Sequence, residues 1–294
     1  MHFYDSIYVL RFKTVEGNFL GMFLAIDVGG TKTLVAVFTN DGKLKQTIKL
    51  KTPKDYAKFI GAVHATVSRL DNYKFQQACV AIPGKIDRNS GVGLAFGNLD
   101  WKNVNIKQDL KKFISCPIVI ENDANLAGLY EARNIKNDYN RVLFLTVSTG
   151  IGSGIIIDDI IDSDFQDSEA GHMMVQFGDN MIPWEDVASG SAIKAKYNKM
   201  AKDITDRQIW KDISFRLAIG IMNLIATIQP EVIVIGGGVG THFNKFKTPL
   251  NQALKKMSTP LTPIPPIIQA NKPEEAVIYG CYEMAKDTYG QANK

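Results

Sequence analysis

Glycine-rich turns follow three apolar segments of this chain directly, and this pattern restricts the possible folds more than any other feature. The segments with their turns are Phe23–Asp27 before Val28-Gly29-Gly30-Thr31, Leu143–Val147 before Ser148–Gly154, and Val232–Ile235 before Gly236-Gly237-Gly238. After the first two turns a second apolar run begins at once, Thr33–Phe38 and Ile155–Ile157, so each pair is predicted to form a β-hairpin. A helix would follow the glycines in a Walker P-loop or a Rossmann turn, so neither motif is predicted here.

The two predicted hairpins lie about 120 residues apart, which favours a duplicated fold of two α/β lobes. The 294 residues suffice for two lobes that share a cleft. Further strands are predicted at Cys79–Ile82 and at Pro117–Ile120, which leads into Glu121-Asn122-Asp123. Apolar residues recur at helical spacing in Asp55–Leu70, Ile106–Phe113, Ala124–Ala132, Ile213–Ile228 and Glu274–Lys286. The predicted sheet therefore presents polar residues at its carboxyl edge.

Charge and cysteine content argue against several classes of protein. The 34 basic and 30 acidic residues give a net charge of +4, and the lysines are spread along the chain, which does not favour nucleic-acid binding. The three cysteines have no metal-binding spacing and fit a reducing compartment. No apolar run approaches the roughly 18 residues of a membrane span, and residues 1–21 lack the pattern of a signal peptide. We expect a cytoplasmic protein without membrane or nucleic-acid partners.

The first 21 residues are treated as an N-terminal extension. Met22 stands directly before the first apolar segment and is a possible translation start. We therefore expect residues 1–21 to be dispensable.

The three turns are candidates for nucleotide binding. The first offers backbone N–H groups and hydroxyls to phosphate oxygens, and Asp27 is suited to hold Mg2+, directly or through water. The second suits the β and γ phosphates of ATP, and the third suits the adenosine. The alternatives are a tight hairpin capped by Asp27 and a plain strand-to-helix turn at Gly236–Gly240. The predicted cofactor-binding residues are Asp27, Gly29, Gly30, Thr31, Lys32, Thr149, Gly150, Gly152, Gly237 and Gly238.

Asp123 is the candidate general base. It lies where a predicted strand ends and a helix begins, so the alternative role is that of a helix N-cap. Phosphoryl transfer needs little covalent chemistry from the protein, but a carboxylate that accepts the proton of the attacking hydroxyl is a recurrent part.

Several polar side chains are candidates to bind sugar hydroxyls. They are Asn98, Asn122, Glu169, His172 and Glu185. For Glu169, His172 and Glu185 the alternative is a solvated loop side chain. Asn98 could instead form an Asx turn before a buried Trp101.

Taken in order, these segments resemble the ROK family (repressors, open reading frames and kinases) from about residue 22 to residue 286. The matching segments are Asp27–Thr33, Pro83-Gly84, Asn98–Trp101, Glu121–Asn125, Ser148–Gly154, Glu169–His172, Trp184–Gly190 and Ile235–Val239.

The resemblance implies the actin-like ATPase fold (ribonuclease H-like, α/β), with two lobes around a central cleft. Residues 22–126 would form the N-terminal lobe, residues 127–273 the C-terminal lobe, and a helix at 274–288 would return to the first lobe. The resemblance also implies that Asp123 is the catalytic base, that Asn98, Asn122, Glu169, His172 and Glu185 bind the sugar, and that the glycine turns bind ATP with Mg2+. A homodimer is implied as well.

The chain departs from the family pattern at the sugar loop. ROK kinases typically follow the Gly-His of Gly171-His172 with a cysteine cluster that binds a structural zinc together with the His, but Met173–Pro183 contains no cysteine. His172 alone cannot build a tetrahedral site, so we expect no structural zinc and a loop held by packing of Phe177 and Trp184. The family's repressors carry an N-terminal helix-turn-helix segment, which residues 1–22 are not expected to supply.

The leading hypothesis is an ATP-dependent kinase in which Asp123 activates a primary hydroxyl, O6 of an aldohexose such as glucose. Alternatives are a kinase for an N-acetylhexosamine or for fructose, and a polyphosphate-using glucokinase, because relatives without the zinc include such enzymes. A non-enzymatic alternative is a catalytically silent sugar sensor.

Overall fold

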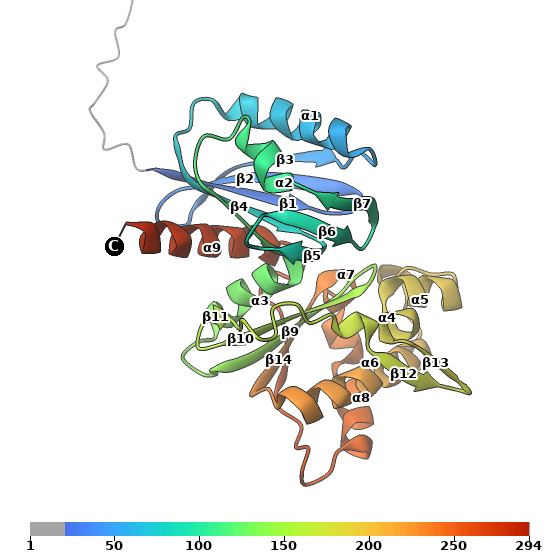
Figure 1. The fold of residues 1–294 in the computed structure, drawn as a ribbon. Coiled ribbons are helices and arrows are strands. Elements are labelled where there is room, and N and C mark those ends of the chain that lie inside the picture. Colours follow the sequence, from blue (N-terminus) through green and yellow to red (C-terminus); the bar gives the residue numbers. More distant parts are fainter. Residues whose placement is uncertain (1–20, 294) are drawn as a thin grey trace, which may run out of the picture.

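The computed structural model describes residues 21–293, which form two lobes, each built on a five-stranded mixed sheet (Figure 1). The expectation that residues 1–21 are dispensable concerns a segment whose first 20 residues lie outside this range. No helix among residues 21–293 is long and apolar enough to cross a membrane.

The first sheet has the strand order β3-β2-β1-β4-β8. Its strands are β1 (Met22–Val28), β2 (Lys32–Phe38), β3 (Leu44–Lys51), β4 (Phe75–Ile82) and β8 (Ile118–Asn122). The hairpin predicted at the first glycine turn is confirmed, because β1 and β2 pair antiparallel with Val28 opposite Thr33. The strands β4 and β8 run parallel to β1, so their carboxyl ends meet at one edge of the sheet.

Helices α1 (Tyr56–Val67) and α2 (Ile106–Lys111) cover one face of this sheet (Figure 1). Their buried side chains pack with those of β1 in one core, because both helices place apolar residues at helical spacing. A small antiparallel sheet of β5 (Gly84–Asp87), β6 (Val92–Phe96) and β7 (Leu99–Val104) follows β4 directly.

The second sheet repeats this topology with the order β11-β10-β9-β14-β15. Its strands are β9 (Arg141–Val147), β10 (Ile151–Ile157), β11 (Ile160–Ile161), β14 (Val232–Gly236) and β15 (Ile267–Gln269). The second predicted hairpin is confirmed by the antiparallel pair β9 and β10, and β14 runs parallel to β9. The duplicated α/β architecture predicted from the two hairpins is therefore present.

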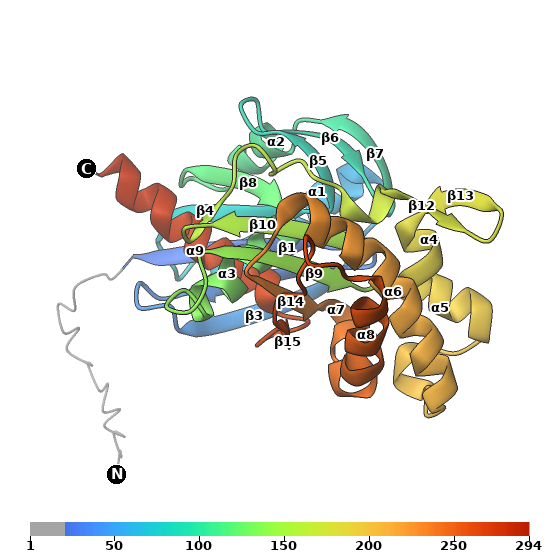
Figure 2. The ribbon, with the colours of Figure 1, turned by 90° about the horizontal axis from the view of Figure 1, so that it is seen from below.

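The second lobe carries most of the remaining elements. They are η2 (Ala170–His172), β12 (Met174–Phe177), β13 (Asn180–Pro183), α4 (Trp184–Ala188), α5 (Gly190–Tyr197), η3 (Ala201–Asp203), α6 (Arg207–Ile228), α7 (Gly237–Gly240) and α8 (Phe243–Met257). Figure 2 shows the β12–β13 hairpin at the end of the molecule opposite to the free end of α9 (Ala276–Ala292).

Two helices, α3 (Asp123–Asn134) and α9, join the lobes. Helix α9 lies on the face of the first sheet opposite to α1, where the ring of Tyr282 stacks on that of Phe38 at 5.2 Å between centroids. Helix α3 packs on β9 and β10 of the second sheet and on α9. A Cβ atom on Gly280 of α9 would lie 1.9 Å from the carbonyl oxygen of Leu126 in α3, so only glycine permits this close approach of the two helices.

Candidate active site

The parallel strands of the first sheet bring the carboxylates of Asp27, Glu121 and Asp123 to its carboxyl edge. In the register across the sheet, Asp27 of β1 pairs with Ala81 of β4, and Ala81 pairs with Glu121 of β8. Asp123 follows two residues after Glu121 and opens helix α3. The edge of an open α/β sheet at the carboxyl ends of its strands is a common place for a ligand site.

The N-cap of α3 is Asn122, so the alternative role of Asp123 as the N-cap is wrong. The Asn122 Oδ1 atom accepts hydrogen bonds from the backbone N–H groups of Ala124 at 2.8 Å and Asn125 at 3.2 Å. Asn122 Nδ2 donates to the carbonyl oxygen of Gly84 at 3.2 Å. Because Asn122 takes the cap, the carboxylate of Asp123 needs only one local hydrogen bond, from Ala124 N at 2.8 Å, and keeps lone pairs for a substrate proton.

Asp123 and Asp27 titrate at unusually high pH. Burial, helped by the negative charge of Asp27 and opposed by the hydrogen bond from Ala124, raises the pKa of Asp123 to about 7. Burial also raises the pKa of Asp27 to about 6, while the charge of Lys32 opposes this rise. Because Asp27 has the lower pKa, it ionises first, and its charge then opposes the ionisation of Asp123. A carboxyl with a pKa near neutrality is suited to general-base catalysis at that pH.

Asp27 is also the residue that fits a magnesium ion. Asp27 and Asp123 are neighbouring carboxyls with raised pKa values, so a divalent cation near them would stabilise their ionised forms. Within residues 21–293 no group of three or more His, Cys, Asp or Glu side chains is placed to hold a metal. This arrangement suits Mg2+, which is often held by one or two carboxylates, waters and substrate phosphates.

The β1–β2 turn places exposed backbone beside the carboxylates. The N–H group of Gly29 donates to the carbonyl oxygen of Lys32 at 3.0 Å and closes the turn, which also carries Thr31. Lys54 Nζ donates to the carbonyl oxygens of Gly30 at 3.3 Å and of Asn98 at 2.9 Å. Asn98 therefore belongs with this turn, and among the described residues no hydrogen bond or ion pair joins it to the other predicted sugar ligands.

The β9–β10 turn lies against α4. A Cβ atom on Gly150 would lie 2.5 Å from Glu185 Oε2, and one on Gly152 would lie 3.1 Å from the Cβ atom of Ala124 in α3. The backbone N–H group of Ile151 donates to Glu185 Oε2 at 3.1 Å. The turn that carries Thr149 is thus fixed to the predicted sugar ligand Glu185 and to the start of α3.

The third turn is the strand-to-helix turn that was the alternative at Gly236–Gly240. Gly237 has φ +79° and lies close to the carbonyl oxygen of Val147, so glycine is required there. At Gly238 no heavy atom lies within 4 Å of the position that a Cβ atom would take, which leaves room for a ligand beside the backbone. This turn starts the short helix α7 next to β9.

Three predicted sugar ligands come together where η2 adjoins α4: Glu169 directly before η2, His172 at its end and Glu185 on α4. His172 Nε2 lies 4.0 Å from Glu185 Oε1. Glu169 is exposed, but the surrounding protein removes part of the hydration of its carboxylate and so raises its pKa. His172 opposes this rise in pKa, and the charge of Glu185 adds to it. The charge of Glu169 in turn raises the pKa of Asp123, so this group adjoins the candidate base.

Four residues at this site were assigned no role from the sequence: Lys54, Arg88, Glu121 and Asn125. Glu121 and Asn125 flank Asn122 and Asp123 in the sequence, and this proximity was the available signal. Arg88 is a single basic residue in the β5–β6 turn, and its contacts with Glu121 and Asp167 depend on the tertiary fold alone.

The loop that carries a zinc cluster in typical ROK kinases is here the β12–β13 hairpin followed by α4. Trp184 is fully buried, and its Nε1 donates to the carbonyl oxygen of Arg216 at 3.0 Å. The guanidinium of Arg216 lies over the ring of Phe177 at 4.4 Å. These side chains are not suited to bind a zinc ion. The hairpin is held by packing around Phe177 and Trp184. That the protein carries no zinc stays a prediction.

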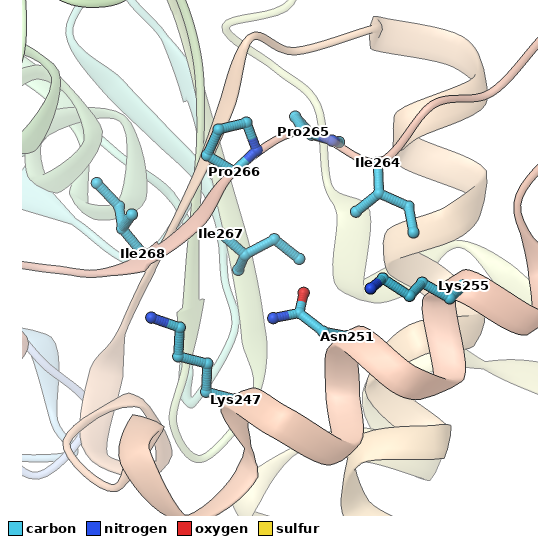
Figure 3. A pocket seen from close by; sticks show the side chains of 8 residues that line it. All are labelled: Lys247, Asn251, Lys255, Ile264, Pro265, Pro266, Ile267 and Ile268. Carbon is cyan, nitrogen blue, oxygen red and sulfur yellow. The ribbon is translucent and has the colours of Figure 1, made fainter.

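A surface hollow of about 510 Å³ lies elsewhere on the second lobe (Figure 3). It is lined by Lys247, Asn251 and Lys255 of α8 and by the segment Ile264–Ile268. None of the predicted site residues lines it. The hollow is therefore no part of the candidate active site.

Comparison with known proteins supports the same family. A family model described as the ROK family matches residues 23–288. The chain is 22% identical to the glucokinase of Streptomyces coelicolor over 91% of this chain and 98% of that one. It is 27% identical to a fructokinase of Lactococcus lactis subsp. cremoris over 73% of this chain and 78% of that one.

Solved structures show the same fold. A ROK family glucokinase from Streptomyces griseus, in complex with glucose and AMPPNP, has a TM-score of 0.79 at 22% identity and covers 91% of this chain and 100% of its own. A ROK family transcriptional regulator, homologous to the E. coli MLC protein, has a TM-score of 0.80 at 16% identity and covers 92% of this chain and 79% of its own. The predicted two-lobed, actin-like α/β fold is thereby confirmed.

Proposed function

The chain belongs to the ROK family, and on this premise we propose that it is a sugar kinase that transfers the γ-phosphoryl group of ATP to a hydroxyl of a hexose. The observation that carries the proposal is Asp123, a carboxyl whose pKa is raised to about 7 at the start of α3. It adjoins both Asp27 and Glu169, a group for the phosphate side and a group for the sugar side. The acceptor we favour is O6 of glucose, in line with the glucokinases among the relatives.

In the proposed reaction the sugar is oriented by Glu169, His172 and Glu185, with its acceptor hydroxyl against Asp123. The Asp123 carboxylate takes the hydroxyl proton as the sugar oxygen forms a bond to the γ-phosphorus. The bond between the γ-phosphorus and the β,γ-bridging oxygen breaks, and ADP leaves with the electron pair. A magnesium ion at Asp27, when bound, would neutralise charge on the phosphates.

The glycine turns would hold the nucleotide. Backbone N–H groups in the turns that contain Gly30 and Gly150 are donors for phosphate oxygens, and Gly238 leaves open space for the adenosine. The two turns belong to different lobes, so closure of the lobes would bring ATP to the sugar and exclude water.

Replacement of Asp123 by Asn is the direct test of this proposal. We expect Asp123→Asn to lower kcat by about 100-fold to 10,000-fold, because the base acts mainly in the transition state. Sugar affinity measured by calorimetry should stay within about threefold, since Asn keeps the size and polarity of the side chain. Turnover close to that of the unmodified protein would reject Asp123 as the base.

The acceptor and the donor are decided by one assay of the unmodified protein. Glucose, N-acetylhexosamines and fructose are each tested with ATP and with polyphosphate, in the presence and absence of Mg2+. Fructose is included because a fructokinase is among the relatives.

A sugar sensor is the second candidate, favoured by the similarity of the fold to that of a transcriptional regulator. A sensor would bind one of these sugars in calorimetry without consuming either donor. Phosphorylation of any of the sugars at a rate that depends on Asp123 would exclude it.

A further inference from the structure

One arginine of the first lobe contacts the loop of the second lobe that leads to Glu169. Arg88 Nε donates to Glu121 Oε2 at 2.7 Å, and Nη2 donates to Glu121 Oε1 at 2.6 Å. The same guanidinium reaches the 162–168 loop, where Nη1 donates to Asp167 Oδ1 at 2.6 Å and Nη2 to the carbonyl oxygen of Gln166 at 3.1 Å. Arg88 thus bridges the end of β8 and this loop.

A second connection runs in parallel through Asn125. Its Nδ2 atom donates to Glu121 Oε1 at 3.0 Å and to the carbonyl oxygen of Gln166 at 2.8 Å. Glu121 also accepts the backbone N–H group of Asn122 at 2.7 Å. Both Glu121 and Asn125 are buried, with 5% and 2% of their surface exposed. We call Arg88, Glu121, Asn125, Gln166 and Asp167 the Arg88 bridge.

The Arg88 bridge connects the two sides of the candidate site. At one end, Glu121 holds the backbone of Asn122, directly before Asp123. At the other end, the bridge holds Gln166 and Asp167, which lie three and two residues before Glu169. The 162–168 loop is also tied to the second sheet at its two ends, by the hydrogen bond from Asp162 N to the carbonyl oxygen of Ile155 at 3.1 Å and by a long contact from Ser153 Oγ to the carbonyl oxygen of Ser168 at 3.4 Å. The Arg88 bridge is the connection of this loop to the first lobe.

We propose that Arg88 is a positioning residue that sets the place of the sugar ligand Glu169 relative to the base Asp123. This inference rests on the proposed sugar kinase function. A sugar bound by Glu169 must present its hydroxyl to Asp123, and a misplacement of about 1 Å can cost about 100-fold in rate. The planar guanidinium is suited to this task, because it donates to Glu121 and to the loop at the same time in a fixed geometry.

A purely structural role is the competing explanation. Glu121 is a buried carboxylate, and removal of its partner would destabilise the fold whether or not Glu169 moves. Arg133 provides a matched control, because it is as exposed as Arg88, 20% against 21%, and also pairs with two carboxylates, Glu283 and Asp287. It lies on α3, but these carboxylates are on α9, away from Glu169.

The test compares Arg88→Met with Arg133→Met and Arg88→Lys. For Arg88→Met we expect the KM for the sugar to rise by about 10-fold or more and kcat to fall, with the KM for ATP unchanged, because Glu169 is displaced relative to Asp123 while the nucleotide turns are not. Amide hydrogen exchange in residues 162–169 should become faster. Arg133→Met should lower Tm without either change, and Arg88→Lys should restore part of the sugar affinity.

A second variant keeps the test valid if Arg88→Met fails to fold. The side chain of Asp167 is 51% exposed, so Asp167→Ala should fold normally. We expect it to raise the sugar KM severalfold and to accelerate exchange in residues 162–169. In the double variant with Arg88→Lys, the Asp167 change should have a smaller effect than it has alone, because the two side chains act through one contact.

Two results would overturn the proposal. One is an unchanged sugar KM and unchanged exchange in residues 162–169 for both Arg88→Met and Asp167→Ala. The other is an effect on the sugar KM that Arg133→Met reproduces at an equal loss of Tm. If the protein phosphorylates no sugar, the proposed function is refuted. Hydrogen exchange does not require turnover, so it still tests whether Arg88 holds residues 162–169.

Discussion

Asp27 and Asp123 form a pair of carboxyls whose charges disfavour each other. In the free protein the pKa of Asp27 is raised to about 6 and that of Asp123 to about 7. Between these values the pair holds roughly one proton, which belongs mainly to Asp123. The proposed base is therefore only partly ionised at neutral pH, and its activity depends on pH in the range where many cells operate.

The pH dependence of kcat/KM for the sugar should report this pair. A base must be ionised to accept a proton, so kcat/KM should rise as pH increases through about 6 to 7 and level off above about 8. Below about 6 it should fall at least tenfold per pH unit. Steady-state rates from pH 5 to 9 measure the profile, with stability checked at each pH.

Carbon-detected NMR titration of Asp123 in Asp27→Asn gives the control for this profile. Removal of the negative charge at position 27 should lower the pKa of Asp123, because that charge is one of the causes of its rise. A flat profile of kcat/KM between pH 5 and 8 would contradict the assignment of Asp123.

At the scale of elements, the contact between α3 and α9 depends on one glycine. A Cβ atom on Gly280 would overlap the backbone of Leu126, whereas a Cβ atom on Gly290, in the same helix, meets nothing within 4 Å. Both positions are in α9, Gly280 in its interior and Gly290 in its last turn. A comparison of alanine substitutions at Gly280 and Gly290 thus distinguishes the effect of helix–helix packing from that of helix propensity.

We expect Gly280→Ala to destabilise the protein by about 2 to 4 kcal/mol, because the two helices must move apart. Gly290→Ala should be neutral or should stabilise by up to about 1 kcal/mol, since alanine favours a helix. Urea unfolding of both variants measures the difference. An equal effect at the two positions would show that α9 does not lie as closely on α3 as described.

The elements that the sequence predicted are those with local signals. Both hairpins and the helices around Asp55–Leu70 and Ala124–Ala132 follow from apolar periodicity and glycine turns, and they are present. That Asn122 and not Asp123 is the N-cap of α3 was not predictable, because both residue types are good N-caps and the hydrogen bond of Asn122 to Gly84 depends on the tertiary fold.

The parts that were missed depend on contacts between distant segments. The small β5–β6–β7 sheet has strands of only four to six residues, and a register shift interrupts the pairing of each neighbouring pair, so the sequence does not mark it clearly. Arg88 lies 33 residues from Glu121 and 79 from Asp167 along the chain, and no motif connects the three. The grouping of Asp27, Asp123 and Glu169 was predicted only through the family resemblance.

For the molecule as a whole, stability should not depend on a metal ion. The β12–β13 hairpin is held by the buried indole of Trp184 and by Arg216 over Phe177, where related kinases are expected to use zinc. Treatment with a zinc chelator should leave Tm unchanged within about 1 °C, because no metal binding would contribute to folding. One tightly held zinc per chain in elemental analysis, or a marked loss of Tm on chelation, would contradict this prediction.

Helix α9 follows the entire second lobe in the sequence but packs on the first lobe. The first lobe therefore lacks this helix until the second lobe has been synthesised. The face of the first sheet formed by Phe23, Ala25, Cys79 and Ala81 is covered by α9. While the ribosome makes residues 83–275, this apolar face has no native cover, and at about 5 to 20 residues per second the interval is roughly 10 to 40 s. The nascent first lobe thus exposes this apolar face to the solvent until translation reaches α9.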